Sequence, residues 1–291
     1  MTRAPSKHQA TALYRALAWT PLIYLVVFGI GWLIFGHFFP PFSPADSAQE
    51  IADQFMERRV PILFGSVLIM VATMILMPMS ALLVMIIRKI EGQTGVLTLI
   101  MAFTTTTYMV MNFFVPFGFA LATFRPDRNP ELVQFAGDFA FMQFMGGIPM
   151  FWMFWVVAAI ASFISSRTPD PVFPRWFGYF NVWCALLYIP ELLIFFFKTG
   201  PFAWDGVVGF WIPAVVFIAW FVVTAFVCRN VVRRPDWAPS PARSDNNFDT
   251  VAACNHPTGR LARDQSQVAT RTDSSTRRAL RSCDRTPERG V

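Results

Sequence analysis

Residues 61–87 read PILFGSVLIMVATMILMPMSALLVMII, a run of 27 residues without one charged side chain. A helix needs about 20 mostly apolar residues to cross a hydrocarbon layer of roughly 30 Å, because every backbone polar group must be bonded inside the segment. Apolar runs of about 10 to 14 residues belong instead to buried helices of soluble cores. The run therefore predicts a transmembrane α-helix.

Five more apolar runs of similar length occur in the chain. Of its 291 residues, 55% are apolar, including 32 Phe and 10 Trp, which is too apolar for an ordinary soluble domain. We therefore expect an all-α fold, a polytopic transmembrane bundle of about six helices. The predicted spans are residues 18–39, 61–87, 96–119, 139–164, 176–197 and 207–232.

The segments on either side of this 18–232 membrane domain differ from it in composition. Residues 1–17 precede a first span that is longer than a signal-peptide core and lacks a cleavage site, so we expect that span to be retained. Residues 233–291 are rich in Arg, Ser, Thr, Asp and Pro, which predicts a basic, disordered tail. From Arg229 onward there are twelve basic and seven acidic side chains, so most of the net charge of +6 lies here. These arginines could bind anionic lipid or only solvate a loose end.

The first connection, PPFSPADSAQEIADQFMERR (40–59), is longer than the others and carries a helical pattern. Ser43 is the expected N-cap and Pro44 the first helical residue. Apolar residues then recur at helical spacing, which predicts an amphipathic helix at about residues 44–59, on the membrane surface or over the bundle. The alternative is a loop with one helical turn.

The loops between spans differ in basic residues, which are retained on the cytoplasmic side of a membrane. With the N-terminus inside, the inner segments hold ten Lys and Arg and the outer segments hold five. This predicts a multi-pass plasma-membrane protein with both termini cytoplasmic. The inner ten are Arg3, Lys7, Arg15, Arg88, Lys89, Arg167, Arg175, Arg229, Arg233 and Arg234; the outer five are Arg58, Arg59, Arg125, Arg128 and Lys198.

One acidic residue, Glu191, lies inside the fifth span, directly after Pro190. An acidic side chain near the centre of a span costs roughly 2.5 to 3.5 kcal/mol unless it faces a partner or water. At 100° per residue, a polar stripe about 100° wide runs through this position, and we expect it to face the bundle interior. The stripe consists of Asn181, Cys184, Tyr188, Glu191, Phe195 and Lys198.

Further polar residues gather toward the same, extracytoplasmic end of the spans. We interpret them as a polar, partly hydrated pocket walled by spans three to five and closed inward by Phe, Met and Leu. Side chains near helix ends can instead extend to the interface, which fits Asp138 and Lys198 better than Asn112 or Glu191. The candidate ligand-binding residues are Glu191, Asn181, Tyr188, Asn112, Asp138, Gln143 and Lys198.

No pattern in the chain predicts a catalytic or metal centre. There is no Walker loop, GxSxG, HExxH or dinucleotide fingerprint, and the four cysteines are not at metal-ligand spacing. Of three histidines only His37 lies near a span, which excludes a bis-histidine haem. We expect no cofactor, no metal and no nucleic-acid partner.

Three stretches carry a resemblance: FRPDRNPE (124–131), FPRWFGYFNVW (173–183) and FFKTGPFAWDG (196–206). Together they resemble an uncharacterised family of bacterial six-pass membrane proteins. The similarity runs from the PPFSPADSA loop to the end of the last span and excludes the tail after Arg234. It implies the six-pass topology and no catalytic residue.

Three classes of function fit these observations. The first is a protein that binds or transports a small ligand in an outward-facing pocket around Glu191. The second is an accessory or structural subunit without its own ligand, whose partner is another membrane protein. A membrane enzyme with sparse carboxylates comes third, so we expect a non-enzyme. The lipid bilayer is the partner common to all three.

Overall fold

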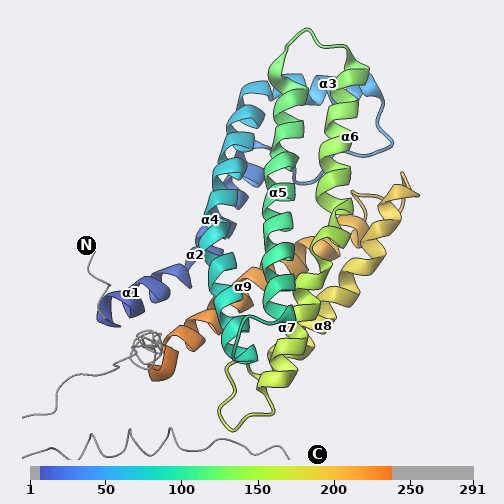
Figure 1. Cartoon of the computed structure of the whole chain (residues 1–291). Helices are drawn as coiled ribbons and strands as arrows, with labels where there is room; N and C mark the ends of the chain where they lie inside the picture. Colours follow the sequence, from blue (N-terminus) through green and yellow to red (C-terminus); the bar gives the residue numbers. More distant parts are fainter. Residues whose placement is uncertain (1–6, 238–291) are drawn as a thin grey trace, which may run out of the picture. The chain divides into compact units, whose positions relative to one another are not determined.

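The computed structural model describes residues 7–237, which form a bundle of helices (Figure 1). Within this described part there is no β-strand, so the predicted all-α fold is confirmed. Five helical segments are long and apolar enough to cross a membrane, as expected of a multi-pass membrane protein: Ala12–Phe35, Arg59–Glu91, Val96–Phe124, Arg175–Phe195 and Val207–Val232.

Irregular helical segments interrupt or extend several of the α-helices; η1 and η4 are π-helical, and η2, η3 and η5 are 3₁₀-helical. The elements in chain order are α1 (Lys7–Leu17), α2 (Thr20–Gly29), η1 (Ile30–Phe35), α3 (Ala48–Glu57), α4 (Arg59–Glu91), α5 (Val96–Phe124), α6 (Pro130–Gly146), η2 (Ile148–Met150), α7 (Trp152–Ser165), α8 (Arg175–Tyr188), η3 (Ile189–Phe195), η4 (Val207–Trp211), α9 (Ile212–Val232) and η5 (Pro235–Trp237).

Helices α4, α5 and α6 run side by side, and α3 lies across their ends (Figure 1). We call this the α3 end of the bundle. At the opposite end, α4 stops at Gly92, whose φ of 76° is the left-handed conformation that favours glycine at a helix C-terminus. The Glu91 carboxylate then accepts hydrogen bonds from the backbone N–H groups of Leu97 and Thr98, at 3.1 and 2.8 Å. These bonds satisfy donors in the first turn of α5, so the α4–α5 turn is closed by its own residues.

The predicted amphipathic helix is present as α3 and packs over the bundle, against α4, α5 and α6. Its N-cap is Ser47 and not Ser43, because Ser47 and Glu50 form a reciprocal capping box. The N–H of Ser47 donates to Glu50 at 2.8 Å, and that of Glu50 donates to Ser47 Oγ at 3.3 Å. Ser43 instead begins a tight turn, in which its carbonyl accepts the Asp46 N–H at 3.1 Å. The buried face of α3 consists of Ile51, Ala52 and Phe55.

The first span lies earlier in the chain than predicted: it runs from Ala12 to Phe35, and its beginning belongs to an unexpected helix, α1. The helix ends at Phe35 and not at residue 39, because His37 adopts a positive φ of 51°. The chain then turns back, and Phe38 is buried in the core, where its ring stacks on Phe119 with centroids 4.0 Å apart.

The fourth predicted span, 139–164, is divided into α6, η2 and α7. Helix α6 begins earlier than predicted, at Pro130, because Asn129 Oδ1 accepts the N–H of Glu131 at 2.9 Å and proline suits the first helical position. It ends at Gly146, before the short η2 turn that contains Pro149. Proline has no N–H and its ring clashes with the preceding turn, which favours a break here beside Gly146 and Gly147, whereas α4 and α5 continue through Pro78 and Pro116.

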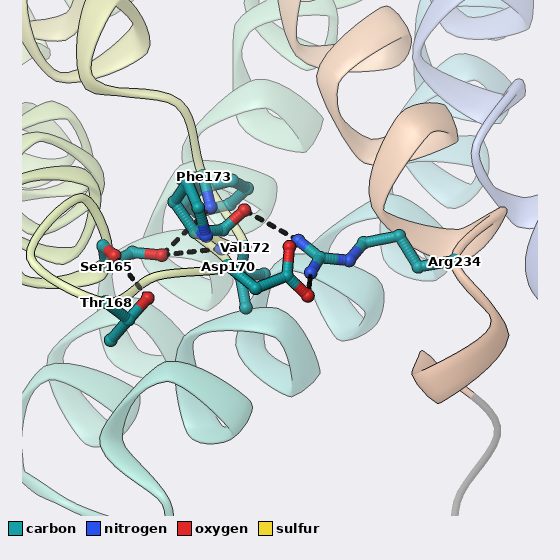
Figure 2. Close-up of polar contacts among 7 residues, drawn as sticks. Ser165, Thr168, Asp170, Val172, Phe173 and Arg234 are labelled. Atoms are coloured by element: carbon teal, nitrogen blue, oxygen red, sulfur yellow. Dashed lines mark hydrogen bonds and ion pairs between the residues drawn. The ribbon is translucent and has the colours of Figure 1, made fainter.

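The described chain extends beyond the start of the predicted tail at residue 233. The Arg234 guanidinium donates to the carbonyl of Pro171 at 2.6 Å and forms an ion pair with Asp170, which ties the end of α9 to the α7–α8 loop (Figure 2). Trp237 is buried and packs edge-on against Tyr14, with centroids 5.8 Å apart. Residues 238–291 of the predicted tail, and residues 1–6, lie outside the described residues.

Candidate functional site

The predicted polar stripe of the fifth span is buried over its first four members, as expected. Asn181, Tyr188 and Glu191 are buried, together with Cys184, but Phe195 and Lys198 are exposed. The stripe turns outward because the helix changes from α to 3₁₀ at Ile189, next to Pro190. A 3₁₀-helix has 3.0 residues per turn instead of 3.6, so a face that is continuous in an α-helix rotates away.

Glu191 lines a cavity of about 310 Å³ at the centre of the bundle. Its side chain is 2% exposed. The walls come from α2 and η1, from α5 to α8, and from η4 and α9, so they include elements from both ends of the sequence. Spans three to five contribute to the walls as predicted, but so do the first and last spans, and the walls are mainly aromatic and not polar. Rings that form them are Phe28, Trp32, Phe144, Phe154, Phe217 and Trp220.

Two fully buried polar atoms in the side chains that line this cavity have no hydrogen-bond partner. They are Oε2 of Glu191 and Nε1 of Trp155, and neither finds a partner among residues 7–237. Trp155 is 4% exposed, and its indole lies on the Tyr188 ring with centroids 4.5 Å apart. Tyr188 also lies close enough to Glu191 for direct electrostatic interaction. The unpartnered acceptor and the unpartnered donor are thus grouped around one tyrosine.

The hydroxyl of Tyr188 is itself occupied, because it donates to the carbonyl of Pro213 at 3.0 Å. Pro213 also lines the cavity, near the beginning of α9. This bond holds α8 against α9 beside Glu191. Glu191 Oε2 and the indole N–H of Trp155, by contrast, have no such partner.

Asn112 lies two hydrogen bonds behind the cavity wall. Its Nδ2 donates to the hydroxyl of Tyr24 at 3.1 Å, and that hydroxyl is 3.4 Å from the hydroxyl of Tyr108, a wall residue. All three side chains are buried. The structure therefore brings Asn112 to the site through two tyrosines and not by direct exposure to the cavity.

Asn181 has a structural environment. Its Nδ2 donates to the carbonyl of Phe177 at 2.7 Å, and its Oδ1 accepts the indole N–H of Trp220 at 2.9 Å. It does not line the cavity. The residue positions Trp220, which is part of the wall, so its contribution to the site is indirect.

Asp138 and Gln143 line a separate groove of about 650 Å³ between α5 and α6. Asp138 Oδ1 and Gln143 Oε1 have no hydrogen-bond partner within the described chain. Lys198 lies close enough to Asp138 for its charge to act on the carboxyl. Met111 belongs to the walls of both the groove and the cavity, so it separates them. Of the seven predicted residues, two line the cavity (Tyr188 and Glu191), two line the groove (Asp138 and Gln143), and three line neither (Asn112, Asn181 and Lys198).

The backbone around the cavity is irregular. The π-helix η1 contributes Trp32, the π-helix η4 contributes Phe210, and the 3₁₀-helix η3 contributes Glu191 itself. Residues on both sides of η2, Met145 and Phe151, complete the set. Single-turn π segments occur often at functional sites. Non-helical backbone at membrane depth is tolerated where it is buried in protein or lines a cavity, and these four segments meet that condition.

Sequence reasoning missed Trp155, the second unpartnered group. A signal was present in the position of this tryptophan. Tryptophan is enriched where spans meet the membrane interface, but Trp155 lies well inside the predicted span 139–164, which is unusual. The contribution of α2 and α9 to the wall had no comparable signal, since their aromatic residues resemble those of any packed membrane helix.

The candidate site contains no cluster of metal-ligating side chains. Within the described residues there is no group of three or more His, Cys, Asp or Glu that could hold a metal ion. Comparison of the sequence with models of protein families, with curated proteins and with solved structures gives no match.

Proposed function

We propose that this protein binds a small, mainly apolar molecule with one hydrogen-bonding group in the Glu191 cavity, within the membrane. The observation that supports this is the pair of unpartnered polar atoms, Glu191 Oε2 and Trp155 Nε1, in the wall of an otherwise aromatic cavity. A buried polar group without a partner costs roughly 1 to 3 kcal/mol. A packed subunit without a ligand gains nothing in return for this cost.

The composition of the wall defines the ligand class. A cavity of about 310 Å³ is at the small end of the usual range for ligand pockets, roughly 300 to 1,000 Å³. Aromatic rings such as Trp32 and Phe144, 4.6 Å apart, offer faces to an apolar body. The carboxyl accepts a hydrogen bond and the indole N–H donates one, so a hydroxyl or an amine on the ligand is the matching head group.

The test uses three probes with one aromatic body: 1-naphthalenemethanol, 1-naphthalenemethylamine and 1-methylnaphthalene. The protein is reconstituted in lipid nanodiscs, and its thermal midpoint is followed as each probe is added. A ligand that binds only the folded state raises stability by RT ln(1 + [L]/Kd), about 2.7 kcal/mol at a hundredfold excess over Kd. We expect saturable stabilisation by the alcohol and the amine and a smaller effect of the hydrocarbon.

Glu191→Leu is the critical variant, and Asp138→Leu is its matched control, because Asp138 is the unpartnered carboxyl of the separate groove. In Glu191→Leu the alcohol and the amine should lose their advantage over 1-methylnaphthalene, whereas Asp138→Leu should respond as wild type. Absence of saturable stabilisation by every probe, or an unchanged advantage in Glu191→Leu, would contradict the proposal. Co-purification of a stoichiometric membrane protein in that case would support the accessory-subunit alternative.

We further infer a plasma-membrane location with both termini cytoplasmic, which places the α3 end of the bundle on the extracytoplasmic side. The support is the count of ten basic residues against five in the connecting segments. Fusions of a fluorescent protein and of alkaline phosphatase after Val291 test it, since the first is active in the cytoplasm and the second outside it. Activity of the phosphatase fusion alone would reverse the orientation.

A further inference from the structure

The cavity is open on one side of the bundle. Most of its wall residues are buried or half-buried, but four have side chains that are 47% to 60% exposed. All four belong to two neighbouring parts of the chain, namely α2 with η1 and the loop after it, and α9, which packs against α2. These residues, which define the lateral opening, are Val26, Leu33, Phe39 and Ile218.

The surface around the lateral opening is apolar. Ile23 and Ile34 are exposed on α2 and η1, and Val215 is exposed on α9. An apolar surface on both sides of an opening in a membrane helix bundle faces hydrocarbon and not water. Toward the end of η1, Phe39 packs against Trp211 with centroids 4.9 Å apart and closes the opening on that side. Aromatic pairs of this kind suit the membrane interface.

Gly29 lies in the wall on the side of the opening. A β-carbon at this position would meet no atom within 4 Å, so Gly29 borders open space. By contrast, Gly31 is required for packing, because a β-carbon there would lie 2.9 Å from the carbonyl oxygen of Gly65. Close helix contact therefore does not require glycine at position 29, and the missing side chain leaves the cavity wall open at this point.

We propose that the ligand is a membrane-dissolved amphiphile with a single apolar chain, and that it enters sideways from the bilayer between α2–η1 and α9. The inference rests on the proposed function, since it uses the same cavity. The head group lies at Glu191 and Trp155, deep in the bundle, and the chain extends along Gly29 toward the opening. A long-chain alcohol or amine has this form: one head that donates and accepts hydrogen bonds, and a body that matches the aromatic wall.

The experiment uses dodecan-1-ol that carries a diazirine in the middle of its chain, dissolved in the lipid of nanodiscs that contain the full protein. After irradiation, the labelled peptides are identified by mass spectrometry. We expect labelling of the inner wall on α7, around Phe154, in addition to the lipid-facing surface of α4 around Val67, which serves as the internal standard. Excess unlabelled dodecan-1-ol should remove the α7 label and leave the α4 label.

Gly29→Phe fills the free space at the opening, and Ala81→Phe is the matched control, because Ala81 is exposed on α4 and does not line the cavity. Relative to the α4 standard, Gly29→Phe should lower α7 labelling at least fivefold, whereas Ala81→Phe should leave it unchanged. Thermal stabilisation by 1-naphthalenemethanol is measured alongside the α7 labelling. It tests ligand binding in the cavity separately from the lateral route of entry.

If Gly29→Phe labels α7 as wild type does while the naphthalene alcohol still stabilises the wild type, the lateral route is wrong and the cavity still binds ligand. If the naphthalene alcohol stabilises the wild type but dodecan-1-ol never labels α7, the single-chain ligand class is wrong. If neither effect is seen in the wild type, the proposed function itself fails. A fivefold loss of α7 labelling in Gly29→Phe, without a loss in Ala81→Phe, supports the lateral route.

Discussion

The indole N–H of Trp220 donates a hydrogen bond of 2.9 Å to Oδ1 of Asn181, and both side chains are buried. This bond joins α9 to α8 beside the cavity. Asn181 also donates to the carbonyl of Phe177. The amide of Asn181 therefore has hydrogen-bond partners, whereas Oε2 of Glu191 on the same helical face has none. Substitution of each residue by leucine should therefore change stability in opposite directions.

Asn181→Leu should lower the free energy of unfolding by about 1 to 3 kcal/mol, because the buried N–H of Trp220 would lose its acceptor. Unfolding in mixed micelles, followed by circular dichroism, measures the change. Asn181→Asp keeps an oxygen at the same place and is the control for the lost hydrogen bond. Equal stability of Asn181→Leu and wild type would show that the bond contributes nothing.

Glu191→Leu should act in the opposite direction and raise the free energy of unfolding in the absence of ligand, by about 1 to 3 kcal/mol, because it removes a buried polar atom that has no partner. The same unfolding assay applies. A group retained for binding at the expense of stability behaves in this way. A marked loss of stability would instead assign Glu191 a structural role.

Gly29→Ala and Gly65→Ala should differ in sign. At Gly65 a β-carbon would lie 2.5 Å from the carbonyl oxygen of Gly31 and 2.8 Å from the backbone nitrogen of Gly36, and backbone atoms cannot move aside cheaply. Overpacking of this kind costs roughly 1 to 3 kcal/mol. At Gly29 the β-carbon meets nothing, and alanine gains roughly 0.5 to 1 kcal/mol in a helix. Thermal midpoints of both variants test the pair; a drop at Gly29 would argue against the open space.

Ser165→Ala should destabilise the α7–α8 loop. The buried hydroxyl oxygen of Ser165 accepts the backbone N–H groups of Val172 and Phe173, at 2.7 and 3.1 Å (Figure 2). Its removal leaves two donors unpaired, that of the buried Phe173 and that of the half-buried Val172, and a buried unpaired group costs roughly 1 to 3 kcal/mol. Ser162→Ala is the control, because the Ser162 hydroxyl donates only to Ala158 of its own helix. Hydrogen exchange of the loop amides should rise in the first variant and not in the second.

Helix α3 should lose protection at acid pH. Hydrogen bonds from the backbone N–H and the hydroxyl of Ser47 hold the pKa of the Glu50 carboxyl below its ordinary value of 4.5. A lowered folded-state pKa contributes stability that is fully present above 4.5 and disappears as the pH falls through the lowered value. Protection factors of α3 amides, corrected for intrinsic exchange, should therefore fall below pH 4.5.

Two variants control this measurement. Glu50→Gln keeps a capping-box side chain without a charge, so its protection should be nearly independent of pH in that range. Ser47→Ala removes the N-cap and should lower α3 protection by about 1 kcal/mol at neutral pH. A pH profile of Glu50→Gln identical to that of wild type would assign the acid sensitivity to another group.

Several features of the candidate site could be read from the chain, and others could not. The 3-4-3 spacing of Asn181, Cys184, Tyr188 and Glu191 correctly predicted a buried face, because residues at that spacing lie on one side of any α-helix. The same reasoning failed at Phe195, since the change to a 3₁₀-helix at Ile189 depends on how Pro190 and its neighbours pack. Asp138 and Gln143 proved to line a different groove, because the sequence does not determine which face of α6 turns toward the cavity.

Membrane class and approximate spans follow from local composition, because the cost of placing a segment in hydrocarbon is a sum over its own residues. Glu191 could be singled out on the same basis, as one unfavourable term in such a sum. The aromatic cavity, its lateral opening and the unpartnered N–H of Trp155 depend on which faces of α2, α7, α8 and α9 meet. Those contacts join residues far apart in the chain, and no sum over neighbouring residues contains them.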